Sequence, residues 1–432
     1  MNRRSIAAMT ITLAAAAGLA QADGAQNRVD QIRPDAPELA RYGAFAIGVQ
    51  EMQFSLPDRV DILNVTEEAT PLYARPYTVE IWYPAADGTL PGGNYRTVIR
   101  DGQTPTTLTG RAARDATPAE GRFPLIVISH GYPGNRFLMA HLGENLASKG
   151  YVAVAVDHAD STYSDQAAFG STLYNRPWDQ RAVIDFIAGI EGPLGAITDT
   201  DNTGVIGYSM GGYGALILGG AGVTEASVGY SWGTPQGLLA ANQAGSDSHE
   251  ALVDDRVRAI IAIGPWGMNT GFWDAEGLAG LRKPTLLMAG SVDDVSIYPA
   301  MRQIFEQATG TERHLLTFVG ANHNAAAPIP APAESWVASP HLDFVPFSHY
   351  ADAVWDTVRM NNITQHFATA FFDLHLKDDS DSGRFLDLVE SAEDGVNARN
   401  EDGSVKPEHS YWEGFAPRTA IGLRFESRAA GE

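Results

Sequence analysis

Apolar residues follow two different patterns along this chain. Near the start, the stretches FAIGVQEMQF (45–54) and YTVEIWYP (77–84) alternate apolar and polar positions. This alternation is typical of strands with one buried face. Between residues 85 and 121 the composition turns to Gly, Pro, Thr, Asp and Arg, which predicts an exposed excursion.

From Phe123 onward the apolar residues form continuous runs. Such runs are typical of parallel strands covered on both faces. Helical patterns separate them at 137–149, at 181–190 and from about Met210. The chain therefore predicts an α/β fold, specifically a doubly wound, mostly parallel sheet with its site at the carboxyl ends of the strands. The predicted buried strands are 123–131, 151–158, 203–207, 257–264, 283–290 and, as the last, 315–323.

These patterns divide the chain into segments. Residues 23–120 are interpreted as an N-terminal β extension of the sheet, and 121–378 as the core. Within the core, 222–255 is a long Gly- and Ser-rich insertion, predicted to be a lid or a substrate wall. Residues 379–432 are predicted to be a polar tail wrapping the surface.

The first 22 residues have the features of an export signal. Arg3 and Arg4 precede an apolar stretch from Ile6 to Ala20, and Ala20-Gln21-Ala22 offers a small-residue cleavage site. An uncleaved anchor helix is the alternative, which the short apolar stretch disfavours. We therefore expect a soluble, exported protein, periplasmic or extracellular, with no membrane span.

Composition excludes several classes of chemistry and partner. The chain has no cysteine, which rules out disulfides and a cysteine nucleophile. A net charge of −22 disfavours nucleic acid and anionic lipid as partners. DTDNTG (199–204) resembles the start of a calcium loop, but Met210 stands where a glutamate is needed. With no metal-site spacing and no phosphate-binding loop, we expect no metal and no cofactor.

Three polar residues each follow a buried run. Gly207, Ser209 and Gly211 form a G-x-S-x-G pattern between a strand and a helix, Asp293 follows the run ending at Gly290, and His323 follows the run beginning at Leu315. The order Ser, Asp, His is that of hydrolases in which a base activates the serine and a carboxylate orients the base. We predict a catalytic triad of Ser209, Asp293 and His323.

Other assignments remain open beside the triad. Asp294 is the alternative acid, although it is better placed to begin the next helix. His158 also follows a strand, but it precedes the serine and is interpreted as structural or pocket-lining. The predicted oxyanion donors are the backbone amides of Met210 and Tyr132, and His130 is expected to brace the Tyr132 loop. Candidate pocket residues, for which core packing is an alternative, are Tyr208, Trp232 and Trp266.

These motifs resemble a known group of proteins. VEIWYP, VISHGYPGNRF, ASKGYVAVAVDH, GVIGYSMGG, AGSVDD and GANHNAAAP are similar to motifs of serine α/β-hydrolases of the dienelactone-hydrolase-like and platelet-activating-factor-acetylhydrolase-like family. SHGY, GYSMGG and the Asp–His pair also resemble bacterial cutinase-type polyester hydrolases. That likeness implies that the tyrosine and methionine at positions 132 and 210 supply the oxyanion amides. The chain lacks the cysteine nucleophile of true dienelactone hydrolases, so the resemblance leaves the substrate open.

The function expected from these residues is ester hydrolysis. Ser209 would form an acyl-enzyme with a small-molecule, lipid or polymer ester, and water would release it. An amidase or peptidase and an acyltransferase using the same triad remain alternatives. A non-catalytic binding protein on this scaffold is disfavoured because no triad member is missing.

Overall fold

A computed structural model describes residues 27–432 of the chain. The predicted signal peptide, residues 1–22, lies outside this range. No helix in the described range is long and apolar enough to cross a membrane.

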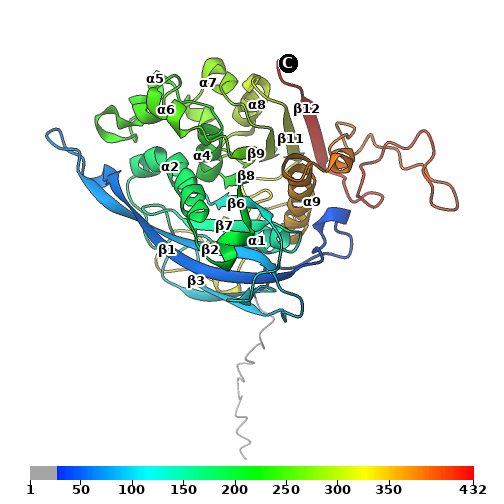
Figure 1. Cartoon of the computed structure of the whole chain (residues 1–432). Helices are drawn as coiled ribbons and strands as arrows, with labels where there is room; N and C mark the ends of the chain where they lie inside the picture. Colours follow the sequence, from blue (N-terminus) through cyan, green and yellow to red (C-terminus); the bar gives the residue numbers. More distant parts are fainter. Residues whose placement is uncertain (1–26) are drawn as a thin grey trace, which may run out of the picture.

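A ten-stranded sheet runs through the molecule in the order β12-β11-β10-β9-β8-β6-β7-β2-β1-β5 (Figure 1). The strands from β11 to β7 in this order are parallel, whereas β2 runs antiparallel to β7 and β1, and β12 antiparallel to β11. The fold is thus the expected α/β-hydrolase fold. The strands are β1 (Ala46–Val60), β2 (Leu72–Ala85), β5 (Ala113–Arg114), β6 (Phe123–Ser129), β7 (Val152–Asp157), β8 (Thr198–Tyr208), β9 (Val257–Ile263), β10 (Thr285–Gly290), β11 (Arg313–Phe318) and β12 (Leu423–Arg428).

Helices cover both faces of the sheet because alternate strand residues point to opposite sides. Ile126 and Ile128 pack in the core with helices α1 (Ala140–Ala147) and α9 (Thr357–Leu376). Leu125 and Val127 pack on the other face. The helices that contribute to the core on that face are α2 (Phe169–Ala188), α3 (Pro193–Ile197), α4 (Met210–Leu218), α6 (Asp247–Leu252), α7 (Ala275–Ala279) and α8 (Tyr298–Gln307).

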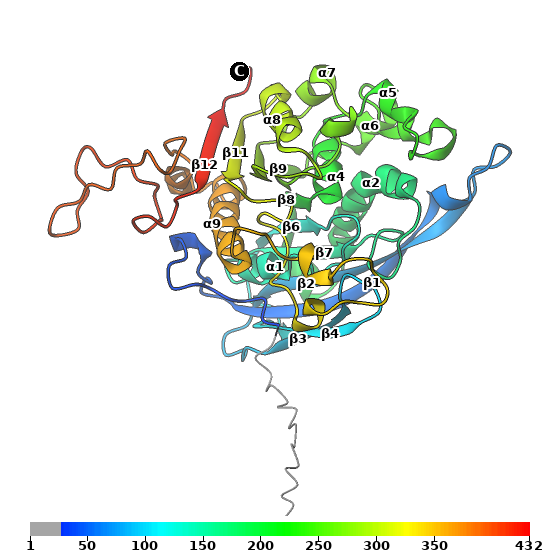
Figure 2. The same ribbon diagram turned by 180° about the vertical axis from the view of Figure 1, so that it is seen from behind.

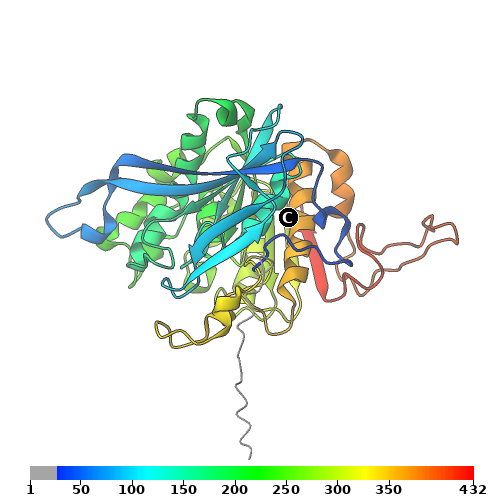
Figure 3. The same cartoon turned by 90° about the horizontal axis from the view of Figure 1, so that it is seen from below.

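The N-terminal segment is less exposed than its composition indicates. We expected an excursion at 85–121, but β3 (Gly93–Val98) and β4 (Pro105–Gly110) form a separate two-stranded sheet. Tyr95 and Leu108 are buried in the core beside α1. The apolar residues that anchor this hairpin are too few to stand out among its polar neighbours. Figure 3 shows the long β1–β2 pair crossing the molecule and extending past it at one end.

The C-terminal segment also departs from the prediction. Residues 379–432 are not only a polar tail, because β12 pairs with β11 and forms the edge of the main sheet. Trp412, Phe415 and Phe425 are buried. The last strand is therefore β12, and its alternation of buried Leu423 and Phe425 with exposed Arg424 is the period-two signal that marks it.

The insertion at 222–255 contains α5 (Glu225–Val228), η3 (Pro235–Asn242) and α6 (Asp247–Leu252). It is fastened to α2, where Trp178 donates a hydrogen bond to Asn242 at 2.9 Å. Another segment, 325–356, lies beside the β3–β4 hairpin instead and is drawn in yellow to gold in Figure 2. It includes the short turns η5 (Ala333–Trp336) and η6 (Pro346–His349).

Candidate active site

Ser209 stands on a sharp turn between β8 and α4. Its backbone has φ 53° and ψ −113°, a region that a serine enters only when the surrounding structure enforces it. A Cβ on Gly207 would lie 2.1 Å from the carbonyl oxygen of Gly211, and one on Gly211 would lie 2.0 Å from that of Ser129. Glycine is therefore required on both sides of the serine, as the G-x-S-x-G pattern predicts.

A row of hydrogen bonds joins Ser209, His323 and Asp293. The Nε2 atom of His323 is 3.0 Å from the Ser209 hydroxyl, and its Nδ1 atom is 2.7 Å from Oδ2 of Asp293. Asp293 follows β10 and His323 follows β11, so neighbouring parallel strands bring the two side chains to the same edge of the sheet. The predicted residues thus lie together in the geometry of a base between a nucleophile and an acid.

The environment of Asp293 keeps its carboxylate ionised. Burial by itself would raise the pKa of Asp293. The hydrogen bond with His323 and the amides of Val295 and Ser296, both 2.8 Å from Oδ1, outweigh burial and lower this pKa below its ordinary value. Asp294, the alternative acid, is exposed and lines the cleft instead.

The predicted oxyanion donors lie on either side of Ser209. Met210 opens α4, and Tyr132 lies on the loop after β6. A Cβ placed on Gly131 would be 3.3 Å from the Ser209 Cβ, which shows how closely this loop approaches. Within residues 27–432, neither the Met210 amide nor the Tyr132 amide donates a hydrogen bond. Both amides are therefore available to a ligand.

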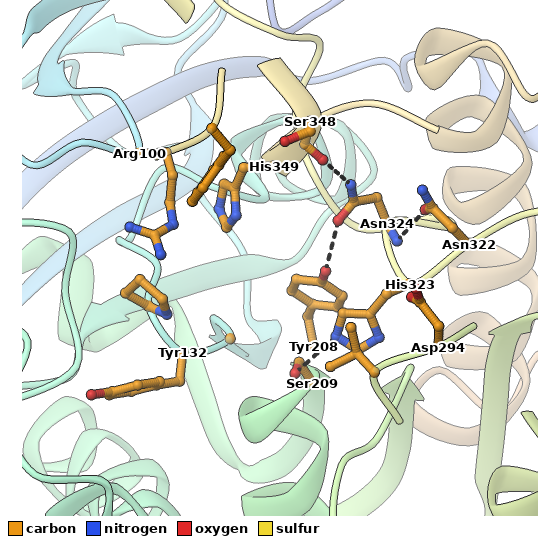
Figure 4. A pocket seen from close by; sticks show the side chains of 14 residues that line it. Arg100, Tyr132, Tyr208, Ser209, Asp294, Asn322, His323, Asn324, Ser348 and His349 are labelled. Carbon is orange, nitrogen blue, oxygen red and sulfur yellow. Dashed lines mark hydrogen bonds between the residues drawn. The ribbon is translucent and has the colours of Figure 1, made fainter. Parts of the chain in front are cut away.

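A cleft of about 410 Å³ opens above Ser209 (Figure 4). Tyr132 and Tyr208 line it, and the Tyr208 hydroxyl donates a hydrogen bond to Asn324 at 3.2 Å. The other two aromatic candidates do not line it. Trp232 is 71% exposed on the surface beside Tyr230. Trp266 packs in an aromatic cluster with Phe169, Tyr213, Tyr230 and Phe272.

Part of the cleft wall comes from segments that sequence reasoning did not assign to the site. None of the lining residues belongs to the insertion at 222–255, so in this structure that insertion is not a wall of the cleft. Segment 325–356 takes this place with Phe344, Ser348 and His349, and the β3–β4 turn contributes Arg100. The Nε2 atom of His349 lies 2.8 Å from the Tyr163 hydroxyl, and its ring borders the cleft.

A second, buried network supports the Tyr132 loop from behind. His158 lies between Ser129, at 2.8 Å, and Asp179, at 3.0 Å, and all three are buried. Burial lowers the pKa of His158 to about 3, so this histidine is neutral at pH 7. His130 bonds to the Gly131 carbonyl at 2.7 Å and accepts the His158 amide at 3.2 Å, so it braces the loop as expected. No member of this network lines the cleft above Ser209.

The sheet and its helices define the α/β-hydrolase fold, and the chain is similar in sequence to proteins named as cutinases and polyester hydrolases. A family model described as PETase, PET hydrolase-like, matches residues 109–232. The chain is 33% identical to a bis(hydroxyethyl) terephthalate hydrolase of Streptomyces coelicolor over 98 residues, which is 23% of this chain and 29% of that protein. It is 25% identical to the cutinase est2 of Thermobifida alba over 202 residues, 46% of this chain and 52% of the cutinase.

The match thus spans about half, or less, of the length of these curated relatives. Among solved structures, a ferulic acid esterase from Streptomyces cinnamoneus superposes with a TM-score of 0.55 at 20% identity. That superposition covers 82% of this chain and 94% of the esterase. At this identity the superposition establishes the fold.

Proposed function

We propose that the protein is a serine carboxylic-ester hydrolase. The observation that carries the proposal is the row Ser209–His323–Asp293 on a strained turn, beside two backbone amides with no partner in the described chain. The relatives named cutinase and bis(hydroxyethyl) terephthalate hydrolase, which are ester hydrolases by name, support it.

In the proposed reaction, the Ser209 hydroxyl attacks the ester carbonyl while Nε2 of His323 takes its proton. Asp293 holds the Nδ1–H side of the ring and stabilises the imidazolium that forms. The negative charge on the carbonyl oxygen is received by the amides of Met210 and Tyr132, at the positive end of α4. The protonated His323 then gives its proton to the leaving alcohol.

The second half of the reaction regenerates the enzyme. A water molecule enters the cleft, His323 takes its proton, and the hydroxide attacks the acyl group on Ser209. The acid leaves when the proton returns to the serine oxygen. A cleft of about 410 Å³ is large enough for a small ester, for one repeat unit of a polyester or for the ester group of a lipid. We include export of the protein, with cleavage after Ala22, in the same proposal.

The test is turnover of p-nitrophenyl esters from acetate to palmitate by the wild-type protein, Ser209→Ala and Ser164→Ala. Ser164 is exposed and makes no side-chain hydrogen bond in the described chain, so its variant is a matched control. We expect Ser209→Ala to lose essentially all turnover without loss of fold. Mass spectrometry after treatment with a fluorophosphonate should place the adduct on Ser209.

Two results would contradict the proposal in different ways. A folded Ser209→Ala variant that keeps more than a few per cent of activity would remove Ser209 as nucleophile. Absence of turnover at every chain length by folded wild-type protein would favour an amide substrate or acyl transfer. Among active chain lengths, a peak at short acyl groups would indicate a narrow acyl site.

A further inference from the structure

Arg100 is a charged group in the cleft that the proposed reaction does not use. It lies on the turn between β3 and β4, and Figure 4 shows it across the cleft from His323 and Asp294. Within residues 27–432 its guanidinium makes no salt bridge, and its side chain donates no hydrogen bond to another residue. The guanidinium lies over the ring of Phe344, with 5.6 Å from its carbon to the ring centroid. The five N–H donors of this arginine are thus available to a ligand.

The neighbouring acidic residue does not neutralise Arg100. The Asp101 carboxylate accepts the amides of Gln103 and Thr104 at 3.0 and 2.8 Å, and the hydroxyls of Thr104 and Ser339 at 2.6 and 2.7 Å. These four bonds tie it to its own turn and to segment 325–356. They occupy its oxygens, so the charged carboxylate of Asp101 makes no ion pair with Arg100.

The other groups around Arg100 are neutral. Burial, followed by the positive charge of Arg100, lowers the pKa of His349 to about 3. Arg100 itself is half-buried, and burial lowers its pKa, but an arginine remains charged at neutral pH. The surrounding phenols are those of Tyr132, Tyr163 and Tyr350. This wall of the cleft therefore carries one positive charge among aromatic rings.

Arg100 differs from the buried arginines of the described chain, whose guanidinium groups are all bonded. The chain holds 52 acidic and 30 basic residues. Buried Arg176 and Arg313 donate to carbonyl and hydroxyl oxygens, and two other inward-facing arginines have acidic partners. Arg75 pairs with Asp160 and Asp179, and Arg136 pairs with three carboxylates. Placing a guanidinium in a half-buried cleft without such a partner costs free energy. A ligand that supplies the missing anion would recover this cost.

We propose that Arg100 binds the free carboxylate of an ester that carries one, such as a half ester of a dicarboxylic acid. This inference rests on the proposed ester hydrolysis and adds the substrate class. A carboxylate matches the guanidinium in a bidentate geometry. A single positive charge suits a monoanion, whereas a phosphate dianion would call for further cations. Asp294 on the opposite wall repels the free carboxylate of the substrate from the side of His323. The substrate is therefore oriented with its carboxylate at Arg100 and its ester carbonyl at Ser209.

The probes are 4-nitrophenyl half esters of adipic, suberic and sebacic acid. Each is paired with the neutral ester in which an isopropyl group replaces the carboxylate, so that size is nearly constant and charge differs. The measured quantity is the ratio of kcat/KM for the anionic ester to that for its neutral partner. The proteins are wild type, Arg100→Met, Arg100→Lys and, as a charge-matched control, Arg258→Met on the exposed side of β9.

Loss of a charge-assisted bidentate contact should lower this ratio about 10- to 100-fold in Arg100→Met for at least one chain length. The ratio for Arg100→Lys should lie between those of Arg100→Met and wild type, because lysine keeps the positive charge but cannot form the bidentate contact of a guanidinium. Arg258→Met should match wild type within about twofold. Should Arg100→Met fail to fold, the decrease in Arg100→Lys decides the question.

A ratio that is the same in wild type, Arg100→Met and Arg100→Lys at every length would overturn the inference. If the neutral esters are turned over normally in that case, the proposed esterase function stands and only the role of Arg100 is lost. If folded wild-type protein turns over neither series, the esterase proposal itself has failed.

Discussion

Replacing Asp179 with alanine should destabilise the whole fold. Asp179 accepts hydrogen bonds from Nε and Nη2 of Arg75 at 2.8 and 2.9 Å, from the Tyr77 hydroxyl at 2.9 Å, and from His158 at 3.0 Å. The side chains of Arg75 and Asp179 are each only 1% exposed. Asp179→Ala leaves Arg75 with Asp160 as its remaining carboxylate partner, at 3.0 Å.

The expected loss of unfolding free energy follows from the Arg75 charge that stays buried in the variant. Removing one partner of a buried ion pair costs about 3–5 kcal/mol, because the other charge remains away from water. Typical unfolding free energies are roughly 5–15 kcal/mol, so a third or more of the stability should disappear. Burial alone would raise the pKa of Asp179, but Arg75 and His158 outweigh it and hold this pKa well below its ordinary value. The ionised Asp179 carboxylate therefore makes its full contribution to the unfolding free energy at pH 7. This contribution is lost only as the pH falls below about 4, the ordinary pKa of an aspartate.

The assay is guanidinium chloride unfolding at pH 7, followed by tryptophan fluorescence. Arg122→Ala is the control, because it breaks a 2.8 Å pair with Asp199 in which the arginine is 64% exposed; we expect a change below about 1 kcal/mol. Adding Arg75→Met to Asp179→Ala removes the buried cation that the single variant leaves with Asp160 alone, so the double variant should be no less stable than the single. A loss below about 1 kcal/mol for Asp179→Ala, or a full extra loss from Arg75→Met, would refute the reasoning.

Three further predictions concern the site and the core. Asp293→Asn should lower kcat on p-nitrophenyl esters by roughly 10³- to 10⁴-fold, because the amide no longer holds His323 in the required tautomer; steady-state kinetics check this, and a loss below tenfold would exclude the assigned role. Gly211→Ala should lower the unfolding free energy by about 3 kcal/mol or more, because the new Cβ meets the Ser129 carbonyl at 2.0 Å. Gly383→Ala, where a Cβ has nothing within 4 Å, is its control in the same denaturation assay, and equal stability of the two variants would contradict the prediction. Burial lowers the pKa of His141 to about 3. Between about pH 6.5 and 3, only the unfolded chain therefore takes up this proton. As the pH is lowered through this range, the unfolding free energy should decrease by up to about 1.4 kcal/mol per pH unit. His141→Phe should remove that part of the slope, and unchanged pH dependence of the unfolding free energy would contradict it.

The positions of Ser209, Asp293 and His323 could be predicted because each follows a strand that the sequence marks clearly. A continuous apolar run identifies a buried parallel strand, and parallel strands end at the same edge of the sheet. The proximity of these three residues could therefore be predicted without knowing the conformation of any loop. The glycines around Ser209 made the turn recognisable for the same local reason.

The hairpin at 93–110 and the strand β12 were missed for a different reason. Tyr95 and Leu108 anchor the hairpin, and Leu423 and Phe425 anchor the strand, but each pair lies in a mostly polar segment. Their burial depends on surfaces that α1 and α9 supply from other parts of the chain. Composition averaged over such a segment reports its exposed majority and hides the few residues that fix it in place.

The part of the cleft wall formed by Arg100, Phe344, Ser348 and His349 was beyond sequence reasoning because irregular segments build it. Arg100 reaches the cleft on a turn that the Asp101–Ser339 bond ties to segment 325–356, and His349 does so through Tyr163. These contacts join residues 238 and 186 positions apart, with no periodic pattern on either side. Strand ends therefore specify the reactive groups, whereas contacts between loops specify which ester fits beside them. Because the two are encoded separately, a substitution at Arg100 can change which ester is selected while the row Ser209–His323–Asp293 stays intact.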